Sequence, residues 1–287
     1  MGFNRPKGNH YIAKMLLRNF TDGQGYIHFL NKLENKTYRT KPDNAFVETR
    51  RYVRYSEDGA QDNYEVEAML SKIEDAAAPV LKIIIAAARE LCLPGLFPNE
   101  NEAWKHFYFT SHMRTPKGAL KILGEITSEQ ALSEAIDNVL DDVARSPLSR
   151  GIQDRSLLRR ELQRMVKHNV AADIAVERPL HIQEELRKHA ARVGLIIGVA
   201  QDLTTEFIIG SCATVEILPR SKTERLQGLW LPISYDVAIS ITGLPDEEHM
   251  WELTTLEVQQ MNEATFQNSE IIGARSAHLL EPYKQPG

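Results

Sequence analysis

The stretch HAARVGLIIGVA (residues 189–200) marks the change that decides the fold class. Residues before Gly194 continue a helical pattern, whereas from Leu195 onward β-branched residues become frequent and apolar residues come in short runs. Short runs of this kind, bounded by turn residues, are typical of β-strands. We expect strands at 195–200, 206–210, 214–218, 230–233 and 237–242, then a helix at about 255–268 and an extended segment at 270–274.

The region before this change is mostly helical. Apolar residues at three- and four-residue steps predict a helix over 62–88, which Pro79 is expected to kink or split. Nearer the N-terminus, residues 10–20 predict a short amphipathic helix, and alternation at 26–32 followed by 37–40 predicts a β-hairpin. Further helices are predicted at 99–114, 128–143, 154–176 and 179–194.

This order of elements predicts an α+β fold, with a helix-rich middle, an N-terminal hairpin and a C-terminal, mainly antiparallel sheet. We expect the hairpin to join that sheet and close a single composite domain over 1–287. Its parts are an N-terminal motif and hairpin at 10–60, a helical region at 62–193, and a β-rich region with the final helix at 194–275.

Composition indicates a cytoplasmic protein. No stretch approaches the roughly 18 consecutive apolar residues that span a bilayer, and residues 1–10 lack the apolar core of a secretion signal. Cys92 and Cys212 are the two cysteines, and they form no metal-type or redox-type spacing. We therefore expect no membrane association.

Charge is unevenly distributed along the chain. The net charge is −5, yet residues 1–60 and residues 145–192 each contain eleven lysines and arginines against six acidic residues, a net +5. Such segments on an acidic protein can form a local phosphate-binding face and so bind nucleic acid. Alternatively, these lysines and arginines simply lie on the solvated faces of long helices.

Several motifs in one order resemble a large, mostly bacterial family of unknown function. They are His10-Tyr11-Ile12-Ala13 followed by Leu17-Arg18-Asn19-Phe20, the aromatic-rich 51–55, the helix 67–74, His112–Pro116, Phe207–Val215 with Pro232-Ile233-Ser234, and a helix with Asn262 near its centre. In this respect the chain resembles the DUF4238 family from His10 to about Arg275. The resemblance implies a shared fold and no settled activity. We expect Asn262, which lies at a matching position, to contribute to substrate binding. Two departures are Ala13, where the family has proline, and Ser211-Cys212-Ala213-Thr214, where many relatives have Ser-Asp-Asn-Pro.

The first candidate site lies in the N-terminal motif. His10 can act as a general acid or base at a phosphodiester, and Lys14 and Arg18, four residues apart, can stabilise the developing negative charge. The alternative is structural: His10 caps the helix that follows, and Arg18 pairs with a carboxylate.

The second candidate pair ends the helix at 99–114. His112 lies on the apolar face, where it can line a cleft with His10 or form a hydrogen bond within the core. Arg114, at the helix C-terminus, can hold a phosphate or cap the last carbonyl groups.

The third candidate pair is Glu67 and Glu74, seven residues apart on one helix face. Paired carboxylates can hold Mg²⁺ or act as acid and base, although a solvated acidic face or salt bridges to Arg18 and Arg114 are the stronger interpretation. No other cofactor is expected, because histidine and cysteine spacings typical of zinc are absent from the sequence.

Together these features predict a nucleic-acid-cleaving effector of a bacterial toxin or phage-defence type. In that mechanism His10 and His112 exchange protons, Arg18 and Arg114 hold the phosphate, and Glu67 or Glu74 orients them or binds metal. The alternative is a non-enzymatic binding or sensor protein whose polar residues are structural, and a third hypothesis is a hydrolase that uses Cys212. An enzyme requires these residues in one solvent-open cleft, whereas a structural network is buried and paired. Self-association into a homo-oligomer is compatible with each.

Overall fold

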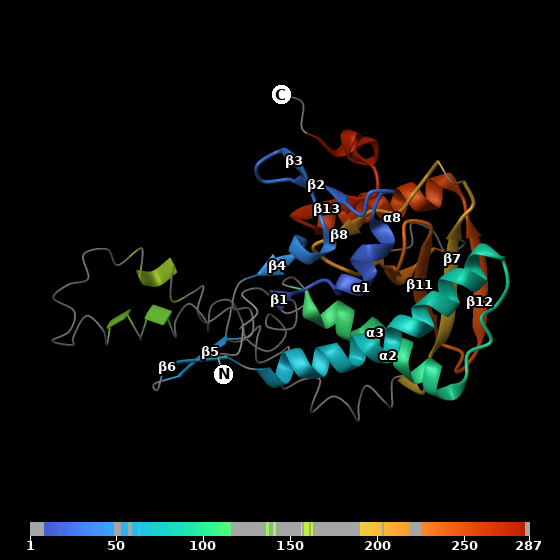
Figure 1. The fold of residues 1–287 in the computed structure, drawn as a ribbon, viewed down its shortest axis with the longest axis horizontal. Helices are drawn as coiled ribbons and strands as arrows, with labels where there is room; N and C mark the ends of the chain where they lie inside the picture. Colours follow the sequence, from blue (N-terminus) through green and yellow to red (C-terminus); the bar gives the residue numbers. More distant parts are fainter. Residues whose placement is uncertain are drawn as a thin grey trace.

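The computed structural model describes residues 9–48, 53–56, 59–62 and 64–115, isolated positions between 136 and 162, and then 190–202, 204–218 and 226–284. Within these ranges the chain forms helices together with antiparallel and mixed sheets (Figure 1). The α+β class predicted from the sequence is confirmed. The helices predicted at 128–143, 154–176 and 179–194 lie largely outside the described residues.

The predicted N-terminal hairpin forms, and it pairs with a strand from the far end of the chain. Strands β2 (Ile27–Asn31) and β3 (Lys36–Thr40) are antiparallel, and β13 (Ile271–Ala274) pairs with the other edge of β2. The two-residue strand β8 (Ile209–Gly210) completes a four-stranded sheet in the order β3-β2-β13-β8. The hairpin therefore joins C-terminal strands, but in a sheet separate from the one that contains most of them.

A second sheet contains most of the C-terminal strands. Its order is β12 (Glu248–Leu253), β7 (Gly194–Ala200), β11 (Val237–Thr242), β10 (Gly228–Pro232) and β9 (Val215–Ile217). All neighbours are antiparallel except β12 and β7, which run parallel. The sequence does not predict β12, because this edge strand is largely half-buried and lacks the continuous apolar run of β7.

Two long helices pack against each other beside this sheet (Figure 1). Helix α2 (Tyr64–Arg89) passes through Pro79 without interruption, and α3 (Pro98–Arg114) buries the predicted Trp104, Phe107 and Tyr108. Pro79 and Asp75 are both exposed, so the carbonyl group that Pro79 leaves without a donor lies on the solvent side. The helix is therefore not split. Tyr108 donates a hydrogen bond to the Leu229 carbonyl of β10 and fixes α3 to the sheet.

Residues 9–20 form shorter elements than predicted, and they lie at the centre of the molecule. Helix α1 (Lys14–Leu17) continues into the 3-10 helix η1 (Arg18–Phe20), and Leu16, Leu17 and Phe20 are fully buried in the core shared with α2, α3 and β7. The core thus holds η1 beside α2. The remaining elements are β1 (Asn9–His10), η2 (Pro42–Asn44), β4 (Val47–Glu48), β5 (Val53–Ser56), β6 (Gly59–Asp62), α8 (Thr255–Asn268) and η4 (Ala277–Tyr283).

No helix in the described part of the chain combines the length and the apolar character needed to cross a membrane.

Candidate functional site

Arg114 connects three elements through hydrogen bonds. Its guanidinium group donates to the Glu74 carboxylate on α2 and to the backbone carbonyl of His10 on β1. The Arg114 side chain is 7% exposed and that of Glu74 is 22% exposed. Of the alternatives considered for the glutamates, the salt bridge to Arg114 is the one that forms at Glu74. A cation this buried stays charged because a carboxylate and a carbonyl oxygen replace its hydration.

Two further predicted residues have contacts that involve the same N-terminal segment. Glu67 accepts a hydrogen bond from the Asn9 amide at 2.5 Å, and His10 Nε2 lies 3.1 Å from the Pro42 carbonyl oxygen. Because a carbonyl oxygen only accepts, His10 Nε2 carries the proton in this contact. The structure thus brings His10, Glu67, Glu74 and Arg114 together through β1, α2 and α3.

The other predicted residues contact different parts of the fold. Lys14 forms a salt bridge with Asp43 and lowers the pKa of that carboxyl group. The Nδ1 atom of His112 lies 2.7 Å from the Thr214 hydroxyl oxygen. The buried Asn262 accepts from the Ile208 amide at 3.0 Å and donates to the Glu206 carbonyl at 2.8 Å, so it fixes the segment that enters β8.

The turn that departs from the family pattern also has defined contacts. Ser211 Oγ accepts from the Glu270 amide at 3.0 Å, and Cys212 Sγ lies 3.1 Å from the Asn268 carbonyl oxygen. Thr214 supplies the hydroxyl group that contacts His112. This turn therefore links α3 to the segment between α8 and β13.

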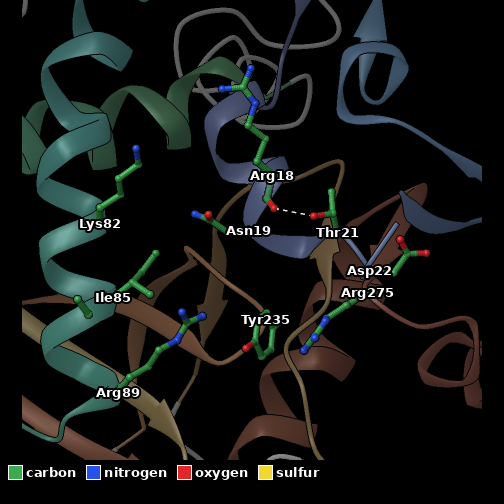
Figure 2. A pocket seen from close by; sticks show the side chains of 11 residues that line it. Arg18, Asn19, Thr21, Asp22, Lys82, Ile85, Arg89, Tyr235 and Arg275 are labelled. Carbon is green, nitrogen blue, oxygen red and sulfur yellow. Dashed lines mark hydrogen bonds between the residues drawn. The ribbon is translucent and has the colours of Figure 1, made fainter. Parts of the chain in front are cut away.

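A cationic pocket lies between α2, η1 and the connections of the C-terminal strands (Figure 2). Its volume is about 370 Å³, within the range of pockets that bind small molecules. Among the eight residues predicted from the sequence, all of which the structure describes, Arg18 is the one that lines it. The other lining residues are Asn19, Thr21, Asp22, Gly23, Lys82, Ile85, Ala86, Arg89, Tyr235 and Arg275.

Helix α2 supplies one wall of the pocket. Lys82, Ile85 and Arg89 are three and four residues apart, so they lie on one face of the helix. Arg89 donates two hydrogen bonds to Asp236, from Nε to Oδ2 at 2.7 Å and from Nη2 to Oδ1 at 3.0 Å. The Asp236 side chain is 7% exposed. This bidentate pair fixes the guanidinium plane and raises the pKa of Arg89.

Tyr235 lies between two arginines of the pocket. The guanidinium carbon of Arg89 is 5.3 Å from the centre of its ring, and that of Arg275 is 4.2 Å from it. The Tyr235 amide donates to the Asn19 carbonyl at 3.3 Å, and the Asn19 side chain donates to the Ile233 carbonyl at 2.9 Å. The turn that carries Tyr235 is therefore attached directly to η1, and the ring keeps the two guanidinium groups in position.

Arg275 completes the pocket from the end of β13. It forms a salt bridge of 3.3 Å with Glu206, whose side chain is 16% exposed. Burial raises the pKa of Glu206, and the nearby Asp236 adds to this effect, whereas Arg275 and His278 oppose it.

The pocket carries more positive charge than its carboxylates neutralise. Arg89 and Arg275 are each paired with a carboxylate, and the lining Asp22 is paired with Arg39. Arg18 and Lys82, both exposed, form no salt bridge with any carboxylate that the structure describes. The arrangement is therefore suited to binding an anion, and phosphate oxygens are the partners that guanidinium groups bind in a bidentate way.

Lys82, Arg89, Tyr235 and Arg275 are not among the residues predicted from the sequence. Lys82 interrupts the apolar stretch 79–88, and its spacing of seven from Arg89 was a signal for a shared cationic face. Tyr235 and Arg275 lie in connections that have no periodic pattern, so no comparable signal exists for them.

Comparison with known proteins gives one match. The sequence model of a family described as "Protein of unknown function (DUF4238)" matches residues 9–276, and the chain therefore belongs to this family. No curated protein and no solved structure matches the chain significantly.

Proposed function

We propose that this DUF4238 protein binds a phosphate-bearing ligand, either a free nucleotide or exposed nucleotides of a nucleic acid, in the cationic pocket. The observation that carries the proposal is the convergence of Arg18, Lys82, Arg89 and Arg275, from distant parts of the sequence, on one cavity. The pocket size suits one or two nucleotides rather than a duplex.

The pairing of the cations supports binding. Asp236 and Glu206 hold Arg89 and Arg275, and Tyr235 separates them, so little side-chain entropy is lost when these groups bind a phosphate. Arg18 and Lys82 are exposed and form no salt bridge with the described carboxylates, so an anion does not have to displace any of these carboxylates from them.

The experiment is a titration of a fluorescein-labelled single-stranded oligonucleotide with the purified full chain, followed by fluorescence anisotropy. Arg18→Ala and Lys82→Ala are each expected to weaken binding about tenfold, which corresponds to about 1.4 kcal/mol. The matched control is Lys72→Ala, because Lys72 is an exposed lysine of α2 outside the pocket. Equal affinity of all four proteins would contradict the proposal.

Phosphodiester cleavage is the second candidate function, and one observation favours it. Arg18 belongs both to the predicted N-terminal motif and to the pocket, so a phosphate bound by Arg18 lies next to the segment that carries His10. Binding ranks first because Arg114 already contacts Glu74 and the His10 carbonyl, and it would have to exchange these contacts for a phosphate.

Cleavage is tested by incubating the protein with total RNA and with plasmid DNA, with and without Mg²⁺. Cleavage by the wild type that is lost in folded Arg18→Ala and His10→Ala variants would support a nuclease of the toxin or phage-defence type. Binding without cleavage would leave a nucleic-acid sensor in the cytoplasm as the function.

A further inference from the structure

The cations of the pocket form two groups along α2. Lys82 and Arg89 are seven residues apart, which corresponds to about 10 Å along a helix axis. Figure 2 shows Lys82 and Arg18 toward one end of the pocket, with the Arg18 guanidinium group pointing away from the other cations, and Arg89, Tyr235 and Arg275 toward the other end. The Lys82 amine is directed away from Arg89 in Figure 2, so the two groups offer separate contacts to an anionic ligand.

Most of the surface between the two groups is uncharged, and the carboxylate among the lining residues, Asp22, is paired with Arg39. On α2 the residues between them that line the pocket are Ile85, which is 7% exposed, and Ala86. Across the pocket lie Asn19 and Thr21. The Asn19 amide donates to the Ile233 carbonyl and the Thr21 hydroxyl to the Arg18 carbonyl, so both side chains are used within the fold. The middle of the pocket thus suits the uncharged part of a ligand.

The two groups also differ in how firmly they are held. Arg89 and Arg275 are fixed by carboxylates and by the Tyr235 ring, which suits one well-defined phosphate position. Arg18 and Lys82 are exposed at the other end and form no salt bridge with described carboxylates, which suits a second anionic group whose position can vary.

We infer that the pocket binds two phosphate groups joined by an uncharged linker, the arrangement of consecutive phosphates in a single strand of nucleic acid. In such a strand a sugar separates each phosphate from the next, whereas a diphosphate places both charges on adjacent groups. The inference rests on the proposed function and names its ligand class: a nucleic-acid strand with an accessible backbone, not an isolated phosphate or a pyrophosphate.

The test is isothermal titration calorimetry of the full chain with three probes: thymidine 3′,5′-bisphosphate, thymidine 5′-monophosphate and inorganic pyrophosphate. We expect the bisphosphate to bind roughly tenfold more tightly than either of the others. Lys82→Ala is expected to weaken the bisphosphate more than the monophosphate, so that the ratio of their affinities falls toward one. Lys72→Ala, the control on the same helix, is expected to keep the wild-type ratio.

The outcomes separate the inference from the function on which it rests. Equal binding of bisphosphate and monophosphate, or pyrophosphate binding as tight as the bisphosphate, would overturn the two-phosphate inference and leave the anion pocket intact. No binding of any probe, together with no binding of the labelled oligonucleotide, would overturn the proposed function itself. A bisphosphate preference that Lys82→Ala does not change would place the second phosphate elsewhere and also overturn the inference.

Discussion

The polar contacts around Arg114 and those around Arg89 differ in how much accessible positive charge they leave. The Arg114 guanidinium group donates to a carboxylate and to a carbonyl oxygen, and the Arg114 side chain is 7% exposed. Arg89 has a carboxylate as well, but its side chain is 46% exposed and it shares a pocket with Arg18, Lys82 and Arg275. The first group of contacts connects elements of the fold, and the second leaves positive charge facing a cavity. Accessible excess charge, rather than the type of residue, distinguishes a binding site from a structural network.

The largest effect is expected from breaking the Arg114 network. Arg114→Met leaves the Glu74 carboxylate and the His10 carbonyl without their buried donor, so the free energy of unfolding should fall by about 3 kcal/mol. The measurement is urea denaturation. Oligonucleotide affinity of the folded fraction should not change, because Arg114 does not line the pocket.

The matched control for Arg114 is Arg39→Met. Arg39 forms a salt bridge with Asp22, but its side chain is 37% exposed, so its loss should cost less than about 1 kcal/mol. If Arg114→Met costs no more than Arg39→Met, the network does not hold β1, α2 and α3 together.

A second, smaller effect is expected at Asn262. Asn262→Ala removes the partners of the Ile208 amide and the Glu206 carbonyl, and an unsatisfied buried group costs about 1–3 kcal/mol. We expect a loss of about 2 kcal/mol, measured by thermal and urea denaturation, with the exposed Gln267→Ala as control. A stable Asn262→Ala protein that has lost oligonucleotide binding would instead support the substrate-binding role expected from the sequence.

The helices and strands show how far the sequence can predict the structure. Strand β11 and helix α8 begin and end where they are predicted, because their apolar periodicity is strong and turn or capping residues bound them. Thr254, for example, caps α8 by accepting from the Glu257 amide. Strand β12 is missed because its side chains are mostly half-buried on a sheet edge.

The cationic pocket is harder to predict from the sequence than the contacts around Arg114. The network residues occur in motifs that resemble a family, so the sequence singles them out even though it does not give their partners. The pocket depends on Arg275 and Tyr235 lying beside Arg89, and Arg89 is more than a hundred positions from both of them in the sequence. Such convergence arises from the pairing of strands and the packing of α2, and no local pattern encodes it.

A third prediction concerns the aromatic ring between the two arginines. Tyr235→Leu removes both cation–π contacts while keeping an apolar side chain, so Arg89 and Arg275 should become less ordered. Because an exposed contact of this kind contributes about 0.5–1 kcal/mol, we expect oligonucleotide binding to weaken about two- to fivefold. Tyr235→Phe keeps the ring and should bind like the wild type in the anisotropy assay. Equal weakening in both variants would mean that the hydroxyl group, not the ring, acts on the ligand.

The smallest effect is expected at Asp22, the carboxylate on the pocket wall. Burial disfavours its ionised form, but amide hydrogen bonds from Tyr26 and Gln24 and the Arg39 guanidinium outweigh this and lower the pKa of Asp22 to about 2. The unfolded value is about 3.9, so the unfolded chain binds this proton more readily than the folded chain. The stability that ionised Asp22 contributes is therefore fully present above about pH 4 and is lost as the pH falls toward 2.

Asp22→Asn tests this assignment, because asparagine can still accept the two amide hydrogen bonds but has no charge. The measured quantity is the difference between the unfolding free energies of wild type and variant, determined in urea from pH 6 down to pH 2. Taking the difference removes the shared titration of Asp43 and Asp202, whose pKa values are also lowered. We expect the difference to be constant above pH 4 and to decrease below it, by less than the stability lost in Asn262→Ala. A difference that stays constant down to pH 2 would mean that Asp22 gains nothing from its charge, and that Arg39 is held by Gln24 and the Tyr26 ring instead.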